Sequence, residues 1–203
     1  MSGIKDNKGY SLVEIMLAVA LFAFVMGIAL DIFQSVNQSQ KSVMAAQTIQ
    51  ENLRYVLEVM SKEIRQAVRS DSDCWLSATN RVYNQGTIGA NNNVLFFKKI
   101  EKGTNKDICV AYYVDNISNR IRIRRVDITG GANIIVADSY ITPENIKITN
   151  FIFTPIYDNP LNVQPADKIQ PRINLRIGAE MASGQLRHPI LIQTTISSRI
   201  YGD

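Results

Sequence analysis

A single carboxylate near the start of the chain carries the strongest chemical signal in the sequence. Glu14 lies directly before an apolar run, residues 15–30, that contains no other charged residue. A charge at the centre of a membrane-spanning helix costs about 2.5–3.5 kcal/mol on insertion scales, so such a residue usually has a function. Just before it, Gly9 and Tyr10 end a short polar leader. We therefore expect residues 9–14 to hold the main functional site.

The other residue types that catalyse reactions or bind metals form no recognisable group. His188 is the only histidine in the chain. The carboxylates of the second half are spaced without a metal-ligand pattern, and no hydrolase, zinc-protease, P-loop or dinucleotide-binding motif occurs. We therefore expect no enzymatic activity, no metal and no cofactor.

The two cysteines, Cys74 and Cys109, lie far apart in the sequence. Neither has a second cysteine or a histidine nearby, so they fit no zinc pattern. If this region is exported, the two can form a disulfide; the alternative is a pair of buried thiols.

A basic strand is the remaining candidate for a binding surface. Arg120, Arg122 and Arg124 alternate with Ile121 and Ile123. If the isoleucines face the core, the three arginines share the opposite face and could contact DNA or an acidic partner. The alternative is an ordinary solvated strand face. The net charge of +4 is mild and no aromatic residues interleave, so DNA binding is not indicated.

The element that positions Glu14 is an apolar N-terminal segment. Residues 10–33 would extend about 36 Å as a helix, which is enough to cross a bilayer core. Lys5 and Lys8 in the leader favour a cytoplasmic N-terminus. We expect a single-pass membrane protein with its bulk outside the cytoplasm.

Two other interpretations of this segment remain open. A secretory signal would use residues 15–26 as its hydrophobic region and be cleaved near Ala29. The acid at Glu14 and the continuation of the helical pattern past Ala29 argue against it. An uncleaved anchor, carrying an extracellular binding domain, is the second alternative.

The stretch Gly9-Tyr10-Ser11-Leu12-Val13-Glu14-Ile15 resembles the class III signal of type IV prepilins and pseudopilins. The resemblance implies that a membrane peptidase cuts between Gly9 and Tyr10, that Tyr10 is then N-methylated, and that Glu14 guides assembly. It also implies other pilin subunits, the prepilin peptidase and an inner-membrane assembly platform as partners. Many major pilins carry a proline late in this helix, where this chain has Asp31, so a minor subunit is favoured.

Beyond Asp31 the apolar positions thin to a stripe at helical spacing. No proline occurs before Pro143, and we expect one continuous helix from about Tyr10 to Arg69. A globular domain would pack on the apolar stripe of its second half. Residues 51–67 also resemble the matching part of W-type minor pilins and J-type pseudopilins of type II secretion.

After the helix the hydrophobic period changes to two, and turn residues become frequent. We expect a loop region over residues 71–93, an exposed loop over residues 158–171, and an antiparallel sheet laid on the amphipathic helix, which is an α+β fold. The expected strands are residues 94–100, 108–114, 120–126, 133–138, 146–156, 172–179 and 189–199.

The predicted organisation is a leader (1–9), a transmembrane and filament-core helix (10–33), an amphipathic continuation (34–69) and a sheet domain (70–203). With the resemblance, this predicts a structural subunit of a type IV pilus or of a type II secretion-like filament, at the cell surface or in the periplasm after assembly. The alternative is an unprocessed, membrane-anchored extracellular binding domain.

Overall fold

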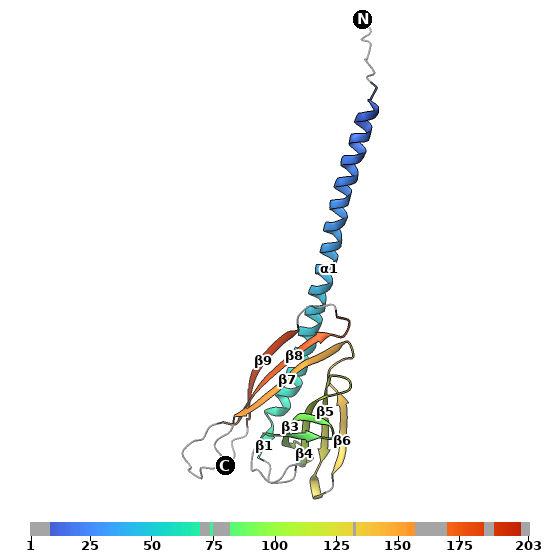
Figure 1. The fold of residues 1–203 in the computed structure, drawn as a ribbon. Coiled ribbons are helices and arrows are strands. Elements are labelled where there is room, and N and C mark those ends of the chain that lie inside the picture. Colours follow the sequence, from blue (N-terminus) through green and yellow to red (C-terminus); the bar gives the residue numbers. More distant parts are fainter. Residues whose placement is uncertain are drawn as a thin grey trace. The chain divides into compact units, whose positions relative to one another are not determined.

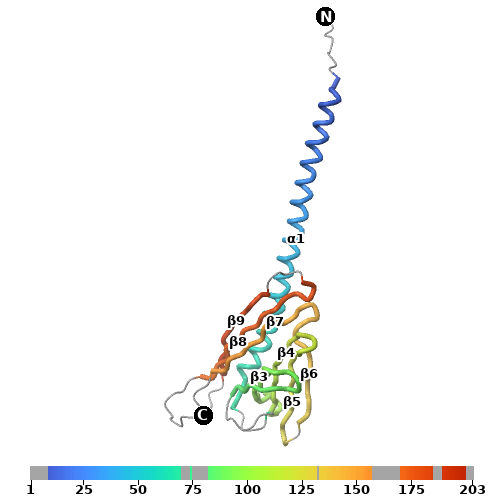
Figure 2. The backbone as a smooth tube through the Cα atoms, in the orientation of Figure 1, coloured from blue at the N-terminus to red at the C-terminus, as the bar shows by residue number. Residues whose placement is uncertain are grey.

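The computed structural model of the chain describes residues 9–69, 74, 82–131, 133–156, 170–184 and 189–199. These residues fall into two compact units, Met1–Met44 and Ala45–Asp203. The helix α1 (Leu12–Ile64) contributes to both units, and the described strands all belong to the second. Figure 1 shows these elements, and Figure 2 traces the same backbone as a tube. The predicted α+β class, with one long N-terminal helix and antiparallel sheets, is confirmed.

In the first unit, α1 is almost entirely apolar as far as Phe33 and mostly polar from Gln34 onward, and every residue from Gly9 to Met44 is exposed. The helix is long and apolar enough to cross a membrane, judged by length and composition. Val36 and Val43 belong to the stripe that we expected to pack on the globular domain, yet both are exposed. Within the first unit, no described residue covers this apolar surface.

In the second unit, α1 buries one face at helical spacing. The side chains on this face are Ala45, Ile49, Leu53, Val56, Met60, Glu63 and Ile64. Five of them (Ile49, Leu53, Val56, Met60 and Ile64) join one hydrophobic core with residues of both sheets. This agrees with the amphipathic pattern read from the sequence, with one polar exception, Glu63.

The helix ends at Ile64, so the predicted continuation to Arg69 is wrong. The Gln66 amide already bonds to the Glu63 carbonyl oxygen at 2.9 Å, a tighter turn than an α-helix makes. The next residues form β1, whose Ala67 pairs with Lys99 of another strand. No glycine or proline marks this end. Pairing with a distant strand, rather than local sequence, therefore ends the helix.

Two antiparallel sheets complete the second unit. The first has the order β1-β3-β4-β5-β6, with β2 pairing β3, and the second has the order β7-β8-β9. The strands are β1 (Ala67–Val68), β2 (Asn84–Ile88), β3 (Asn91–Glu101), β4 (Lys106–Asp115), β5 (Arg120–Asp127), β6 (Ile134–Tyr140), β7 (Ile146–Ile156), β8 (Arg172–Met181) and β9 (Ile190–Ser197). A short 3-10 turn, Thr129–Gly131, precedes β6.

All seven expected strands are present, with ends shifted by a few residues. The expected loop over residues 71–93 is wrong where β2 forms. This strand, Asn-Gln-Gly-Thr-Ile, has no apolar alternation, and a register shift between Gly86 and Ile88 interrupts its pairing with β3. Residues 158–169 of the other expected loop, His188 and residues 1–8 of the leader lie outside the described residues.

Aromatic side chains fix the end of the helix to the first sheet. The Phe97 and Tyr112 rings stack with centroids 6.1 Å apart, and Tyr83 meets Phe97 edge-on at 6.4 Å. The Tyr83 hydroxyl donates a hydrogen bond of 3.1 Å to the Ile64 carbonyl oxygen. This bond satisfies one of the carbonyl groups that the end of a helix leaves without a partner.

The structure joins Cys74 and Cys109 by a disulfide, with their Cα atoms 5.7 Å apart. Both residues are buried and pack with Val126 and Ile128. The bond ties Cys74 to β4 in the middle of the first sheet.

Replacing both cysteines with alanine (Cys74→Ala, Cys109→Ala) should lower the free energy of unfolding by about 3–4 kcal/mol, because the bond closes a loop of 35 residues. Denaturant unfolding of the full-length protein in detergent measures this change. A reductant should destabilise the wild type similarly and leave the double variant unchanged. Equal stability of the oxidised and reduced wild type would contradict the prediction.

Candidate functional site

The candidate site surrounds the N-terminal end of α1. The Ser11 carbonyl oxygen accepts hydrogen bonds from the backbone amides of Glu14, at 3.0 Å, and Ile15, at 3.2 Å. Ser11 and Glu14 have the spacing of a capping box, which favours a helix start at this point. Gly9 and Tyr10 precede the helix and are exposed. The bond between them therefore lies in non-helical, accessible chain.

Glu14 occupies the first turn of α1, one turn from Tyr10. A carboxylate is favourable there because the N-terminal end of a helix carries partial positive charge. Tyr10, Glu14, Ile15, Ala18, Val19 and Phe22 border one shallow groove along this face. Glu14 is the only charged group among them. The face thus presents one acid on an otherwise apolar surface.

Gly9 has no packing role within the described chain. A Cβ atom built on Gly9 meets no other atom within 4 Å. The described structure therefore gives no internal reason for glycine at this position.

Asp31 lies at the far end of the uncharged run. The helix continues through this position without interruption, and the Asp31 side chain is exposed. Glu14 and Asp31 therefore lie at the two ends of the apolar segment, about 26 Å apart along the helix axis.

The comparisons with known proteins bear on this same segment. Residues 4–30 match the family model described as the prokaryotic N-terminal methylation motif. The chain carries a prepilin-type motif. The match includes Gly9, Tyr10 and Glu14 and supports a type IV pilin-like protein with an N-terminal membrane anchor. No curated protein and no solved structure matches the chain.

A second group, missed by the sequence analysis, gathers around Glu63 on the packed face of α1. Glu63 is only 8% exposed. Its Oε1 atom accepts hydrogen bonds from Lys99 Nζ at 2.8 Å and Arg125 Nε at 3.0 Å, and its Oε2 atom accepts one from the Tyr112 hydroxyl at 2.7 Å. These partners come from β3, β5 and β4. One carboxylate therefore holds the helix to three strands of the first sheet.

The surroundings of Glu63 determine its protonation. Burial by itself raises the pKa of the carboxyl, but hydrogen bonds from Lys99 and Tyr112 and the positive charges of Lys99 and Arg125 outweigh it, so the pKa lies below its usual value. Burial and the neighbouring Glu63 raise the pKa of Tyr112. Glu63 is therefore ionised at neutral pH. A signal for this group existed in the sequence, since Glu63 falls within the apolar stripe, three residues after Met60.

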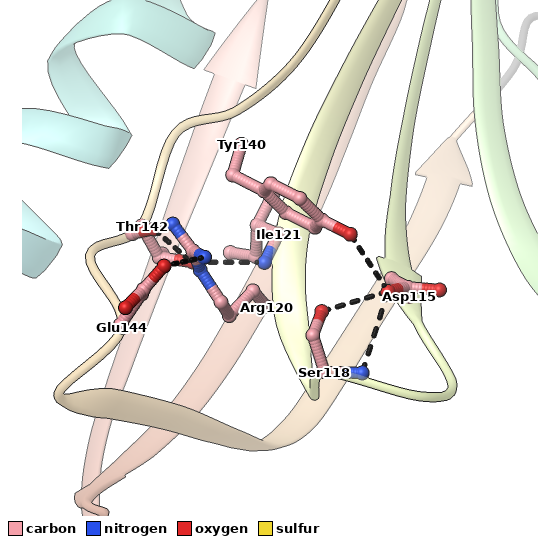
Figure 3. A network of polar contacts seen from close by, with 7 residues as sticks. All are labelled: Asp115, Ser118, Arg120, Ile121, Tyr140, Thr142 and Glu144. Carbon is pink, nitrogen blue, oxygen red and sulfur yellow. Dashed lines mark hydrogen bonds and ion pairs between the residues drawn. The ribbon is translucent and has the colours of Figure 1, made fainter.

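The expected basic face on β5 is largely engaged within the protein. Ile121 and Ile123 are buried, and the three arginines lie on the other face. Arg120 donates hydrogen bonds from Nε and Nη2 to the Thr142 carbonyl oxygen, at 2.9 and 2.7 Å, and lies 3.5 Å from Glu144 Oε1 (Figure 3). Its guanidinium lies 4.3 Å from the centre of the Tyr140 ring.

Asp138 on β6 pairs with both of the other arginines. Arg124 donates to Asp138 Oδ2 at 2.8 Å, and Arg122 Nε approaches Asp138 Oδ1 to 2.6 Å as an ion pair without hydrogen-bond geometry. The face is therefore neither a row of unpaired cations nor a simple solvated strand face. Its arginines bind β5 to β6 and the chain that follows.

The turn after β4 is fixed by Asp115. This carboxylate accepts hydrogen bonds from the Ser118 hydroxyl at 2.7 Å, the Ser118 amide at 3.3 Å and the Tyr140 hydroxyl at 3.0 Å (Figure 3). The Ser118 hydroxyl, with the smaller contribution of Tyr140, keeps the pKa of Asp115 below its usual value. Hydrogen bonds from Ser118 within the turn and from Tyr140 on β6 therefore hold the turn that carries Asn116 and Asn119.

Proposed function

We propose that this chain is a minor pilin or minor pseudopilin, a structural subunit of a type IV pilus or a type II secretion-like filament. The observation that carries the proposal is the methylation motif over residues 4–30, at the head of a helix that is almost entirely apolar as far as Phe33 and fully exposed over that length. Such a surface needs a membrane before assembly and neighbouring helices after it. Asp31 and the resemblance of residues 51–67 to minor subunits support the minor role.

Processing would begin at the Gly9–Tyr10 bond. Its non-helical, exposed position suits a peptidase, and the lack of an internal packing role for Gly9 suits recognition of this glycine by the enzyme. Cleavage creates a new amine at Tyr10, which then receives the methyl group. Before assembly the N-terminus lies in the cytoplasm and the second unit outside, where an oxidising compartment suits the Cys74–Cys109 disulfide.

During assembly, Glu14 would set the axial position of each subunit relative to its neighbour. After cleavage, Glu14 lies one turn from the terminal amine of its own helix. In a filament core, its carboxylate pairs with the amine of a neighbouring subunit. Two charges that are costly to bury then offset each other, but only at the correct axial position. The assembly platform in the inner membrane would supply the subunits in turn.

The mass of the N-terminal peptide, from protein isolated from the cells that make it, tests the proposal. We expect N-methyl-tyrosine at Tyr10 as the first residue. An intact Met1 would favour the unprocessed anchor with a binding domain, and a start near Leu30 would favour a secretory signal.

A glycine variant makes the same test specific to the cleavage position. Gly9→Val should reduce processing at least tenfold, because a branched side chain replaces the residue before the cleaved bond. Gly3→Val places the same change elsewhere in the leader and should be processed normally. Normal processing of Gly9→Val would contradict cleavage at this bond.

A further inference from the structure

A polar cleft lies in the second unit, where the first sheet meets β7. Its volume is about 260 Å³, and it is lined by Asn92, Asn93, Val114, Asn116, Asn119, Ile148, Thr149, Asn150 and Phe151. Most of these residues are asparagines, and none carries a charge. The lining comes from the start of β3, the end of β4, the turn after β4, and β7.

Two hydrogen bonds tie β7 to the first sheet at the two ends of this cleft. The Ile148 amide donates to the Asn119 carbonyl oxygen at 2.8 Å, and Asn93 Nδ2 donates to the Phe151 carbonyl oxygen at 2.5 Å. Between these points the pairing of β7 with β8 shifts register, between Ile148 and Asn150. Such bulges are frequent beside functional sites, because they redirect side chains.

The opposite strand is adapted to this bulge. Gly178 on β8 lies against it, and a Cβ atom there would come 2.9 Å from Thr149 Oγ1 and 3.1 Å from Asn150 Cβ. A Cβ atom at position 178 would clash with the bulge at these distances, so glycine is needed there for the bulge to adopt this position. The wall of the cleft is therefore a built feature of the sheet.

The other wall is held in a defined conformation. Asn93 and Asn119 have left-handed backbones, with φ of 63° and 52°, which is uncommon for residues other than glycine. Asparagine adopts this conformation more readily than other non-glycine residues, which suits it to these two positions. Two hydrogen bonds hold Asn116 in place. Its backbone amide donates to Asn91 Oδ1 at 3.0 Å, and its side-chain Nδ2 donates to the Ala90 carbonyl oxygen at 2.7 Å.

One residue that lines the cleft carries an acceptor without a donor. The Oδ1 atom of Asn150 is buried, and no hydrogen-bond donor reaches it among the described residues. A buried acceptor without a partner is unfavourable. Because this atom is enclosed, a ligand hydroxyl or N–H group in the cleft would reach it only through a rotation of the Asn150 side chain toward the cleft.

We propose that this cleft binds a neutral, hydroxyl-rich group the size of one sugar ring. The absence of charged lining residues disfavours phosphates and carboxylates. The carboxamides of Asn93 and Asn116 already bond within the protein. Those of Asn92, Asn119 and Asn150 would both donate to and accept from a ligand, as sugar hydroxyls do. The volume falls below the about 300–1,000 Å³ of drug-sized ligands, which suits a monosaccharide. This binding goes beyond the role as a filament subunit and does not depend on it.

The test is an NMR titration of the full-length protein in detergent micelles with the methyl glycosides of glucose, galactose, mannose and N-acetylglucosamine. We expect at least one glycoside to shift the side-chain amide signals of Asn119 and Asn150. Asn150→Ala should weaken that glycoside at least fivefold. Asn119→Gly keeps the left-handed backbone while removing the carboxamide, and should weaken it similarly, even if Asn150→Ala does not fold.

Asn145→Ala is the matched control, because Asn145 is exposed and does not line the cleft. It should bind the glycoside as the wild type does. The proposal is overturned if no glycoside shifts these signals, or if the folded cleft variants bind normally. It is also overturned if a neutral amide probe, N-acetylglycinamide, shifts them when no glycoside does, since the cleft would then recognise peptide.

Discussion

Glu14→Gln is expected to leave cleavage between Gly9 and Tyr10 intact and to reduce incorporation into filaments at least tenfold. Glutamine has the same shape but no charge, so it cannot neutralise the terminal amine of a neighbouring subunit. Removing one partner of a buried ion pair costs about 3–5 kcal/mol, because the other charge stays buried alone. The N-terminal mass reports cleavage, and immunoblots of sheared filaments against the membrane fraction report incorporation.

Asp31→Asn provides the matched control for this prediction. Asp31 is also an exposed carboxylate on α1, at the other end of the uncharged run. Neutralising Asp31 should change incorporation less than twofold. When Glu14 pairs with the N-terminal amine of a neighbouring subunit, Asp31 lies far from that amine. Wild-type incorporation of Glu14→Gln, or an equal loss in Asp31→Asn, would remove the basis for a register role.

The sequence predicted those parts of the structure that depend on neighbouring residues. Alternation located the seven longer strands, and helical spacing located the buried face of α1, because each pattern repeats within a few positions. The helix end and β2 escaped prediction for the same physical reason. Ala67 and Asn84 take strand geometry through pairing with Lys99 and Phe96 of β3, and nothing near them in sequence indicates that pairing.

The candidate sites also differ in whether they depend on neighbouring residues or on the fold. Residues 9–14 form a linear motif, so their roles could be proposed before any fold was known. Glu63 and its partners Lys99 and Arg125 are separated by 36 and 62 positions, so only the fold brings them together. The arginines of β5 were predicted to share a face. Their pairing with Asp138 depends on the register between β5 and β6, which alternation alone does not define.

Glu63→Ala is expected to lower the free energy of unfolding of the second unit by about 3–5 kcal/mol. The substitution leaves the Lys99 ammonium and the Tyr112 hydroxyl, both hydrogen-bonded to Glu63, without their acceptor. Denaturant unfolding of the full-length protein, followed by near-UV circular dichroism, measures the change. Glu58→Ala is the control on the same helix: Glu58 is exposed, so its loss should cost less than about 0.5 kcal/mol.

The pH dependence of the free energy of unfolding distinguishes the contribution of the Glu63 charge from that of its packing. Because the folded state holds the pKa of this carboxyl below 4.5, its ionised form stabilises the fold above that pH, and this contribution is lost as the pH falls through the folded pKa. The stability difference between wild type and Glu63→Gln should therefore be constant from neutral pH to about pH 5 and shrink below it. Asp115 and Asp127, whose pKa values are also lowered, are present in both proteins and cancel in the difference. A difference that stays flat down to about pH 3 would mean that Glu63 acts through its shape, and that its charge does not hold the helix to the sheet.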